Sequence, residues 1–199
     1  WEDGGHQVTQ VAWDPAEKEW FGVYADDRQA GEWGSWTGRG MNWNASCAFC
    51  HMTRFHKNYE PTTDTFRSTW HEQGVSCIQC HSDQLSDPPP DRTEFCGTLT
   101  IKQTLDNCAT CHSRRGSYDD DFIPGDDYAD HFHLQLPSQQ GLYYADGQIL
   151  EEVYVWTSFQ MSRMGHSGVK CMDCHNPHSN ALILPAENNA LCMRCHQSP

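Results

Sequence analysis

The chain of 199 residues repeats one short pattern five times, Cys-x-x-Cys-His. The cysteines of the five copies are Cys47 and Cys50, Cys77 and Cys80, Cys108 and Cys111, Cys171 and Cys174, and Cys192 and Cys195. The histidines that follow them are His51, His81, His112, His175 and His196. Two thiols within one helical turn can add to the two vinyl groups of one porphyrin, and the adjacent imidazole can then bind its iron. The pattern therefore predicts five covalently attached haem c groups, each with an iron atom.

Two other kinds of site use closely spaced cysteines, namely zinc knuckles and disulfide frameworks. A zinc site takes its ligands from two paired knuckles, and a disulfide needs no histidine. Neither explains why a histidine follows the second cysteine in every copy. Covalent haem attachment is therefore the preferred interpretation of these ten cysteines.

The composition indicates a fold that depends on its cofactors. Only 37% of the residues are hydrophobic, and the chain contains 15 glycines and 10 prolines. Such a chain builds a thin apolar core by itself, so haem must supply the missing apolar volume. We expect a mostly irregular fold, organised by haem, with several α-helices and a small N-terminal β-hairpin. Removing haem should unfold it, as removing the metal unfolds small metal-binding domains.

The charge and hydropathy of the chain limit which kinds of partner it can bind and where it is located. Its formal net charge is −14, which argues against nucleic acid and favours a positively charged protein surface as partner. The chain has no stretch of about 20 apolar residues, which is the length that a membrane-spanning helix needs. The chain opens at Trp1 without a methionine, as a processed or trimmed chain does. Because c-type haem is attached outside the cytoplasmic membrane, we expect an exported protein, periplasmic or extracellular.

The spacing of the motifs suggests two regions. Residues 1–46 carry no motif but hold most of the tryptophans, and residues 47–199 form a predicted pentahaem domain. Within the first region, residues 7–13 and 20–24 read as strands on either side of a turn at Asp14 and Pro15. Their aromatic residues could contact haem or a neighbouring chain, or simply cover a small apolar layer.

Helices and loops are predicted from periodicity and from helix-breaking residues. Apolar spacing over residues 146–164 fits a helix that begins near Gly147 and ends at Gly165. Shorter helices are expected around 66–80, 103–113 and 186–197. Loops are expected at 88–90, a run of three prolines, and at 119–121, a run of three aspartates.

Seven histidines lie outside the motifs, and they are candidates for the second axial ligand of each iron. They are His6, His56, His71, His131, His133, His166 and His178. His71 and His166 each lie shortly before a Gly-Val-x-Cys-x-x-Cys-His stretch, and His178 follows Asn-Pro directly after a motif. We predict His56, His71, His131, His166 and His178 as ligands. The roles of His6, His133 and the odd cysteine Cys96 stay open, although Cys96 alone is most simply a small buried residue.

Ligand number decides what each haem can do. Iron held by two histidines has no open position and only passes electrons, whereas iron with one protein ligand can bind and reduce a substrate. Enough histidines are present for five bis-histidine sites. Electron transfer is therefore the predicted function, and no catalytic residue is assigned.

Several longer stretches carry a family resemblance. They are Trp43–Cys47, Cys47–Thr53 with Lys57–Tyr59, Gly74–His81, Cys108–Arg115, Asp146–Tyr154, Ser158–Met164 and Cys171–Ser179. In these the chain resembles exported multihaem c-type cytochromes that serve extracellular respiratory systems, including cytochrome segments fused to tetratricopeptide repeats. The resemblance implies a multihaem cytochrome c fold, electron transport along bis-histidine haems, and His131, His166 and His178 as recurring histidines. It fails after His81, where the family's Gly-Pro-Gly turn and histidine are replaced by residues 82–88.

Three functions fit these observations. The first is an electron carrier for extracytoplasmic or extracellular respiration that works with redox protein partners. The second is a subunit of a polymeric extracellular filament, a nanowire in which further copies of the chain supply an intersubunit histidine ligand. The third is a multihaem reductase with one five-coordinate haem, for which the missing histidine after His81 is the support.

Overall fold

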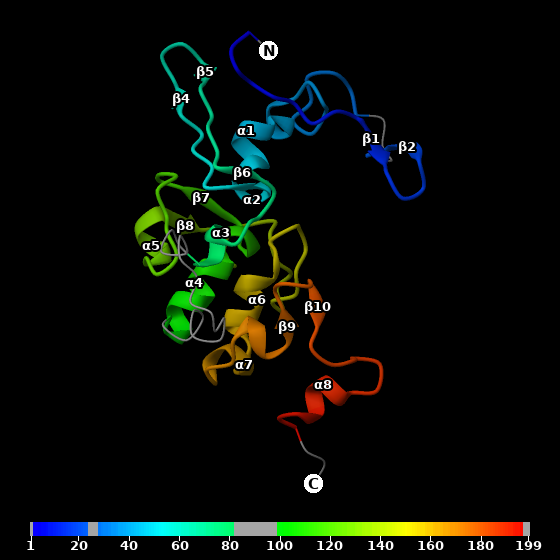
Figure 1. Cartoon of the computed structure of the whole chain (residues 1–199), viewed down its shortest axis with the longest axis vertical. Coiled ribbons are helices and arrows are strands. Elements are labelled where there is room, and N and C mark those ends of the chain that lie inside the picture. Colours follow the sequence, from blue (N-terminus) through cyan, green and yellow to red (C-terminus); the bar gives the residue numbers. More distant parts are fainter. Residues whose placement is uncertain (1, 24–27, 82–98, 197–199) are drawn as a thin grey trace. The chain divides into compact units, whose positions relative to one another are not determined.

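The computed structural model describes residues 2–23, 28–81 and 99–196. The chain forms two compact units, Trp1–Leu85 and Ser86–Pro199. The first two motifs lie in the first unit and the other three lie in the second. In the described ranges every sheet has two antiparallel strands, and the helices are short (Figure 1). The fold therefore mixes helices with small sheets and long irregular stretches.

The first unit begins with a strand pair and continues into the helical turns of the first motif. Its leading elements are β1 Val11–Asp14, β2 Glu19–Gly22, η1 Arg39–Met41, α1 Trp43–Ser46 and α2 Ala48–His51. Strands β1 and β2 pair antiparallel, and the rings of Trp13 and Trp20 meet edge to face 5.6 Å apart. Asn42 caps α1 by accepting a hydrogen bond from the backbone N–H of Ala45 at 2.9 Å.

The rest of the first unit is extended where a helix was predicted. Its elements are β3 Met52–Thr53, β4 Tyr59–Glu60, β5 Thr65–Phe66, β6 Glu72–Gln73 and α3 Ile78–His81. Strand β4 pairs with β5, and β3 pairs with β6. The prediction of a helix over residues 66–80 is therefore wrong, except for the last turn, which is part of α3. Pairing with β3 holds β6 extended, and Gly74 has a φ of +76°, which is outside the helical region.

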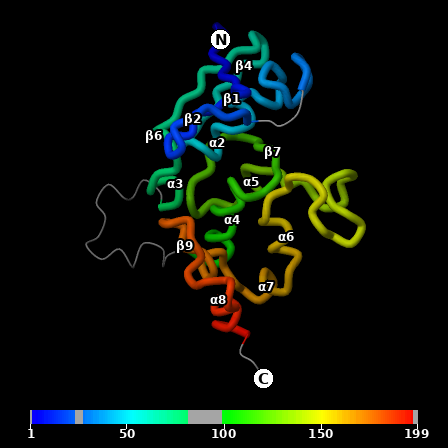
Figure 2. Tube along the Cα trace, turned by 90° about the vertical axis from the view of Figure 1, so that its right-hand side faces the viewer, coloured from blue at the N-terminus to red at the C-terminus, as the bar shows by residue number. Residues whose placement is uncertain are grey.

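The second unit is built on its longest helix. Helix α4 spans Ile101–His112, as predicted for residues 103–113, and Thr100 and Gln103 form a capping box at its start. The other elements that pack near it are β7 Arg115–Ser117, α5 Tyr128–His131 and β8 Phe132–Leu134. Figure 2 follows this path from α4 into β7 and α5. The buried apolar residues of this region are Leu105, Ala109, Phe122, Tyr128 and Phe132.

The predicted helix at 147–164 begins later than expected. The structure has α6 at Val155–Met161 and α7 at Arg163–His166, with a break at Ser162. Residues 142–150 instead fold back on themselves, because Tyr144 and Gln148 bond across a turn at Asp146 and Gly147. Asp-Gly is a strong hairpin turn, and Gly147 has a φ of +87°. Gly165, predicted to end the helix, lies inside α7.

The end of the second unit is a series of short turns. Its elements are η4 Cys171–Asp173, β9 His175–Asn176, β10 Ala181–Leu182 and α8 Ala190–Met193. The helix expected over 186–197 is thus a single turn. Asn189 precedes it with a φ of +59°, so no helix can extend through that residue.

The predicted loops and the membrane prediction can be placed for part of the chain. Residues 119–121 lie outside helices and strands, as expected. The proline run at 88–90, the stretch 82–88 and Cys96 are outside the described residues. In the ranges that the structure describes, no helix is long and apolar enough to cross a bilayer.

The buried carboxylate of Asp106 links α4 to α5, and this contact carries a test of the fold. Asp106, whose side chain is 8% exposed, accepts from the Lys102 ammonium at 2.5 Å and from the Tyr128 backbone N–H at 3.2 Å. We expect Asp106→Ala to reduce the free energy of unfolding by about 1–3 kcal/mol, because it leaves a buried N–H unpaired. Lys102→Ala should cost under about 1 kcal/mol, since that side chain is 61% exposed. Urea titration of the haem-loaded protein measures both, and equal losses would contradict this ranking.

Candidate haem-binding sites

Each motif folds into one helical turn. The second cysteine donates its backbone N–H to the first cysteine's carbonyl at 3.2 Å in four copies, and the Cys108 copy lies within α4. None of the ten motif cysteines forms a disulfide, and none is fully buried. Two thiols and an imidazole therefore come from a single turn, which is the arrangement that covalent haem attachment needs. Within residues 2–23, 28–81 and 99–196, no group of three or more His, Cys, Asp or Glu side chains could hold a metal ion.

A buried threonine ties the first motif to the second. Thr53, which is 0% exposed, donates to the Gly74 carbonyl at 2.7 Å and accepts from the Ser76 N–H at 2.8 Å. The Gly74 N–H bonds in turn to the His51 carbonyl at 3.0 Å. The end of the first motif and the start of the second are therefore held in a fixed spacing.

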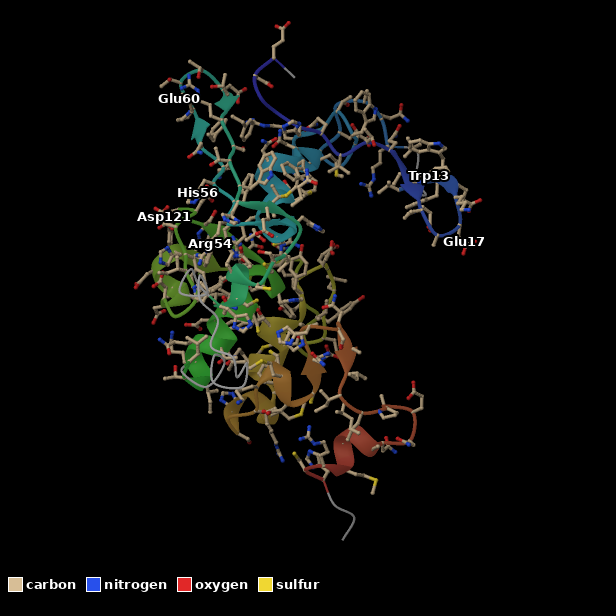
Figure 3. All side chains as sticks on the ribbon, viewed as in Figure 1. Trp13, Glu17, Arg54, His56, Glu60 and Asp121 are labelled. Carbon is tan, nitrogen blue, oxygen red and sulfur yellow. The ribbon has the colours of Figure 1, made fainter. Side chains whose placement is uncertain are left out.

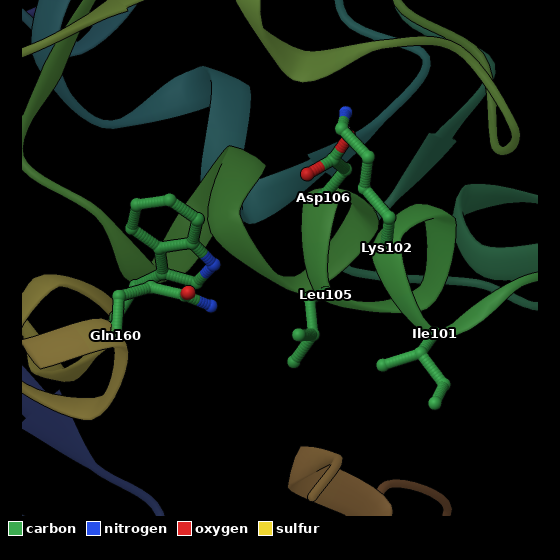
Figure 4. A pocket seen from close by; sticks show the side chains of 6 residues that line it. Ile101, Lys102, Leu105, Asp106 and Gln160 are labelled. Atoms are coloured by element: carbon green, nitrogen blue, oxygen red, sulfur yellow. The ribbon is translucent and has the colours of Figure 1, made fainter. Parts of the chain in front are cut away.

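The third motif lies on the apolar face of α4. Ile101, Leu105, Cys108 and His112 recur every three or four residues, so they share one side of the helix. Ile101, Lys102, Leu105 and Asp106 of α4 line a cavity of about 340 Å³ together with Trp156 and Gln160 of α6. In Figure 4 the Ile101 and Leu105 side chains point to the side of α4 away from those of Lys102 and Asp106. The apolar part of this lining is on the face of α4 that carries Cys108 and His112, where a porphyrin would be attached.

The third and fourth motifs meet through their thiols. The Cys171 thiol is hydrogen bonded to that of Cys108, and this bond is the main cause that lowers the pKa of Cys171 to about 7. Gly168, just before the fourth motif, also lies against the Ile101 side chain of α4. These two attachment sites are therefore neighbours.

The fourth and fifth motifs are also neighbours. Arg194 donates from its guanidinium to the Asp173 carbonyl at 3.0 Å. Burial and the negative charge of Asp173 raise the pKa of the Cys174 thiol, and Cys192 and Cys195 act in the same direction. In the second unit, three attachment sites thus follow one another in space in their sequence order.

The motif histidines and the predicted distal histidines differ in exposure. His51, His112, His175 and His196 are exposed and His81 is half-buried. Among the distal candidates, His71, His166 and His178 are exposed, whereas His56 and His131 are half-buried. The histidines that the sequence predicts as iron ligands are therefore largely at the surface of the polypeptide.

The surroundings of the distal candidates come from different elements. His56 pairs its backbone with Thr69 and lies, with Arg54, between β3 and β4 (Figure 3). His71 lies just before β6 with its Nδ1 3.3 Å from Glu72, while His166 ends α7. The shared sequence around His71 and His166 therefore does not give them the same local structure. His178 lies in the turn between β9 and β10, where its N–H bonds to the Asn176 side chain at 3.0 Å.

His131 and His133 have distinct environments. The His131 ring bonds to Asp119 at 2.6 Å and is 17% exposed. Burial lowers its pKa, but the hydrogen bond and the charges of Asp119, Asp126 and Asp130 outweigh this and raise it. His133 is exposed on β8 and packs over Gly116 of β7, where a Cβ would lie 2.1 Å from the ring. His6 is exposed, and its ring meets Trp43 edge to face.

Some residues that shape these sites carry no sequence signal. Thr53 and Asp119 act through contacts with residues 21 and 12 positions away, and no local motif marks them. Arg115, next to the third motif, donates to the Thr110 carbonyl at 2.7 Å and lies over the Phe132 ring. Its neighbour Arg114 bonds to Gln135 at 2.7 Å. Both guanidinium groups therefore hold the start of β7 against neighbouring segments.

Comparison with known protein families accounts for all the motifs. The model for cytochrome c7 and related cytochrome c matches residues 37–113, which include the first three copies. A model for a doubled CXXCH motif matches residues 166–199, which include the last two. No curated protein and no solved structure matches the chain. Because these two matches include all five motifs, the family resemblance is confirmed: the chain belongs to the CxxCH-repeat multihaem c-type cytochromes, which bind haem c covalently and carry electrons.

Proposed function

We propose that this chain is an exported pentahaem electron carrier of extracytoplasmic or extracellular respiration. Each motif would attach one haem, and its own histidine would bind one side of the iron. The distal ligands would be His56, His71, His131, His166 and His178. Electrons would pass between neighbouring haems by outer-sphere transfer and leave to a redox protein partner.

The succession of neighbouring attachment sites carries this proposal. Thr53 joins the first two motifs, the Cys108 and Cys171 thiols touch, and Arg194 joins the last two. A relay needs this kind of spacing, whereas isolated sites would not exchange electrons quickly. The bound irons would supply the one-electron couple of the relay.

The residues of the chain have two tasks in such a relay. Two histidines would bind each iron and leave no position open for a substrate. The thioether bonds from the cysteines fix each porphyrin to a helical turn, which keeps the distances between haems constant as electrons arrive and leave. Neither task requires an acid, a base or a nucleophile.

Haem count and spin state test the proposal. Intact mass of the purified protein should exceed the polypeptide mass by five haems, and the EPR spectrum of the oxidised protein should contain only low-spin iron. A high-spin signal that shifts with nitrite or hydroxylamine would instead support the reductase. A mass increase of fewer than five haems would contradict the count.

A polymeric filament is a second candidate, which the exposed aromatic residues of the first unit favour. Trp13, Trp20 and Phe21 of the β1–β2 pair are 47%, 68% and 46% exposed, and Trp33 is 75% exposed. Trp13 is labelled on this pair in Figure 3. Exposed apolar patches often mark interfaces. Electron micrographs of native material decide, because discrete particles alone would exclude the filament.

A further inference from the structure

His131 is the predicted distal ligand whose side chain has the most defined surroundings. Its Nδ1 lies 2.6 Å from Asp119 Oδ1, and its ring meets that of Phe122 edge to face at 5.6 Å. Its carbonyl accepts the Tyr118 N–H at 2.8 Å. Both the backbone and the ring of His131 are thus tied to the loop that follows β7.

The two ring nitrogens are in different situations. The Nδ1 contact with Asp119 is a short hydrogen bond, whereas Nε2 makes a longer ion-pair contact of 3.3 Å with the Asp126 carboxylate. Asp126 has a local role, because its carboxylate accepts the Ile123 N–H at 3.0 Å and closes a turn there. With the proton on Nδ1 donated to Asp119, the lone pair of Nε2 can bind a metal, which would replace the longer Asp126 contact.

Asp119 is itself held in place. Its Oδ1, the atom that meets His131, also accepts the Asp121 N–H at 3.0 Å. A carboxylate fixed in this way can orient an imidazole and increase its basicity. Ligating histidines in metalloproteins usually make a bond of this kind through their second nitrogen.

We propose that Asp119 is a positioning residue that orients the His131 imidazole toward iron and lowers the reduction potential of the haem it binds. The inference rests on the proposed function, since it takes His131 to be a ligand. A more basic imidazole donates more charge to iron and stabilises the oxidised state. One haem of the relay would thereby have a lower reduction potential than the same two ligands would give without the Asp119 hydrogen bond.

The test compares matched variants of the haem-loaded protein. Asp119→Asn removes both the negative charge and the strong acceptor. Asp130→Asn is the control, because Asp130 is exposed in α5, acts on His131 only through its charge, and keeps its backbone bond. His131→Ala removes the ligand itself. Spectroelectrochemical titration and low-temperature EPR, both at one fixed pH, give the midpoint potentials and the spin states.

We expect His131→Ala to convert one haem from low-spin to high-spin. Asp119→Asn should keep every haem low-spin and change the oxidised-to-reduced ratio of one haem about tenfold, which is a rise of about 59 mV in its midpoint potential. The EPR signal of the same haem should shift as well. Asp130→Asn should change both the midpoint potential and the EPR signal far less.

Two results would overturn the inference. If Asp119→Asn and Asp130→Asn raise the potential equally, only charge matters and the hydrogen bond does not. If His131→Ala leaves all iron low-spin, His131 is not a ligand and Asp119 has no iron to act on. Neither result removes the relay, which fails separately if the wild-type protein lacks five low-spin haems.

Discussion

Without haem, the chain is expected to lose its folded structure. Nine apolar residues are buried in the part of the chain that the structure describes, while large side chains such as Trp20, Trp33 and Val155 are 65% or more exposed. Ordering a residue costs about 1–2 kcal/mol of conformational entropy, and so small a core cannot offset that cost over 199 residues. Chain made without haem attachment should show no near-UV circular dichroism and no cooperative urea transition. A sharp transition in that material would contradict the dependence on haem.

The loss should also be graded by motif. Cys108→Ser with Cys111→Ser removes attachment on α4, whose buried Leu105 and Ala109 are part of the core. Cys192→Ser with Cys195→Ser is the matched control, because that turn is exposed near the end of the chain. Urea midpoints followed at the haem absorption band should fall much further for the first pair. Equal falls would mean that each haem stabilises only its own turn.

What could be predicted from the sequence was whatever depends on neighbours in the chain. The helical turn at every motif and the helix ending at His112 follow from local chemistry, since the cysteine spacing requires a turn and Thr100 with Gln103 caps the helix. The same reasoning failed at 147–154. Apolar spacing favoured a helix there, but the Asp-Gly turn at 146–147 folds the segment back.

Tertiary partners explain the other differences. Residues 66–80 contain no strong strand signal, and β6 is extended only because it pairs with β3 some twenty positions earlier. Distal histidines are harder still, because a ligand is defined by an iron that belongs to another part of the chain. The chain has enough histidines to give each iron a second ligand. Which histidine binds which iron depends on tertiary contacts such as that of His131 with Asp119, which sequence spacing does not reveal.

Loss of the Thr53 hydroxyl should weaken the contact between the first and second motifs. Thr53→Val keeps the shape of this fully buried side chain but removes its hydrogen bonds to the Gly74 carbonyl and the Ser76 N–H, which are partly buried. A buried group that loses its partner costs about 1–3 kcal/mol. Because these two groups are only partly buried, each should cost about 1 kcal/mol, and the free energy of unfolding should fall by about 2 kcal/mol. Urea titration of the haem-loaded protein measures it.

Thr53→Ser is the matched control, because it retains the hydroxyl and loses one methyl group, which costs about 1 kcal/mol. The two variants should also differ in redox behaviour. Thr53 fixes the spacing between the end of the first motif at His51 and the start of the second at Cys77. Thr53→Val should therefore alter the potentials of two haems together, and Thr53→Ser should leave them unchanged. If the valine variant were as stable as the serine variant, the hydroxyl would not be what holds these two motifs together.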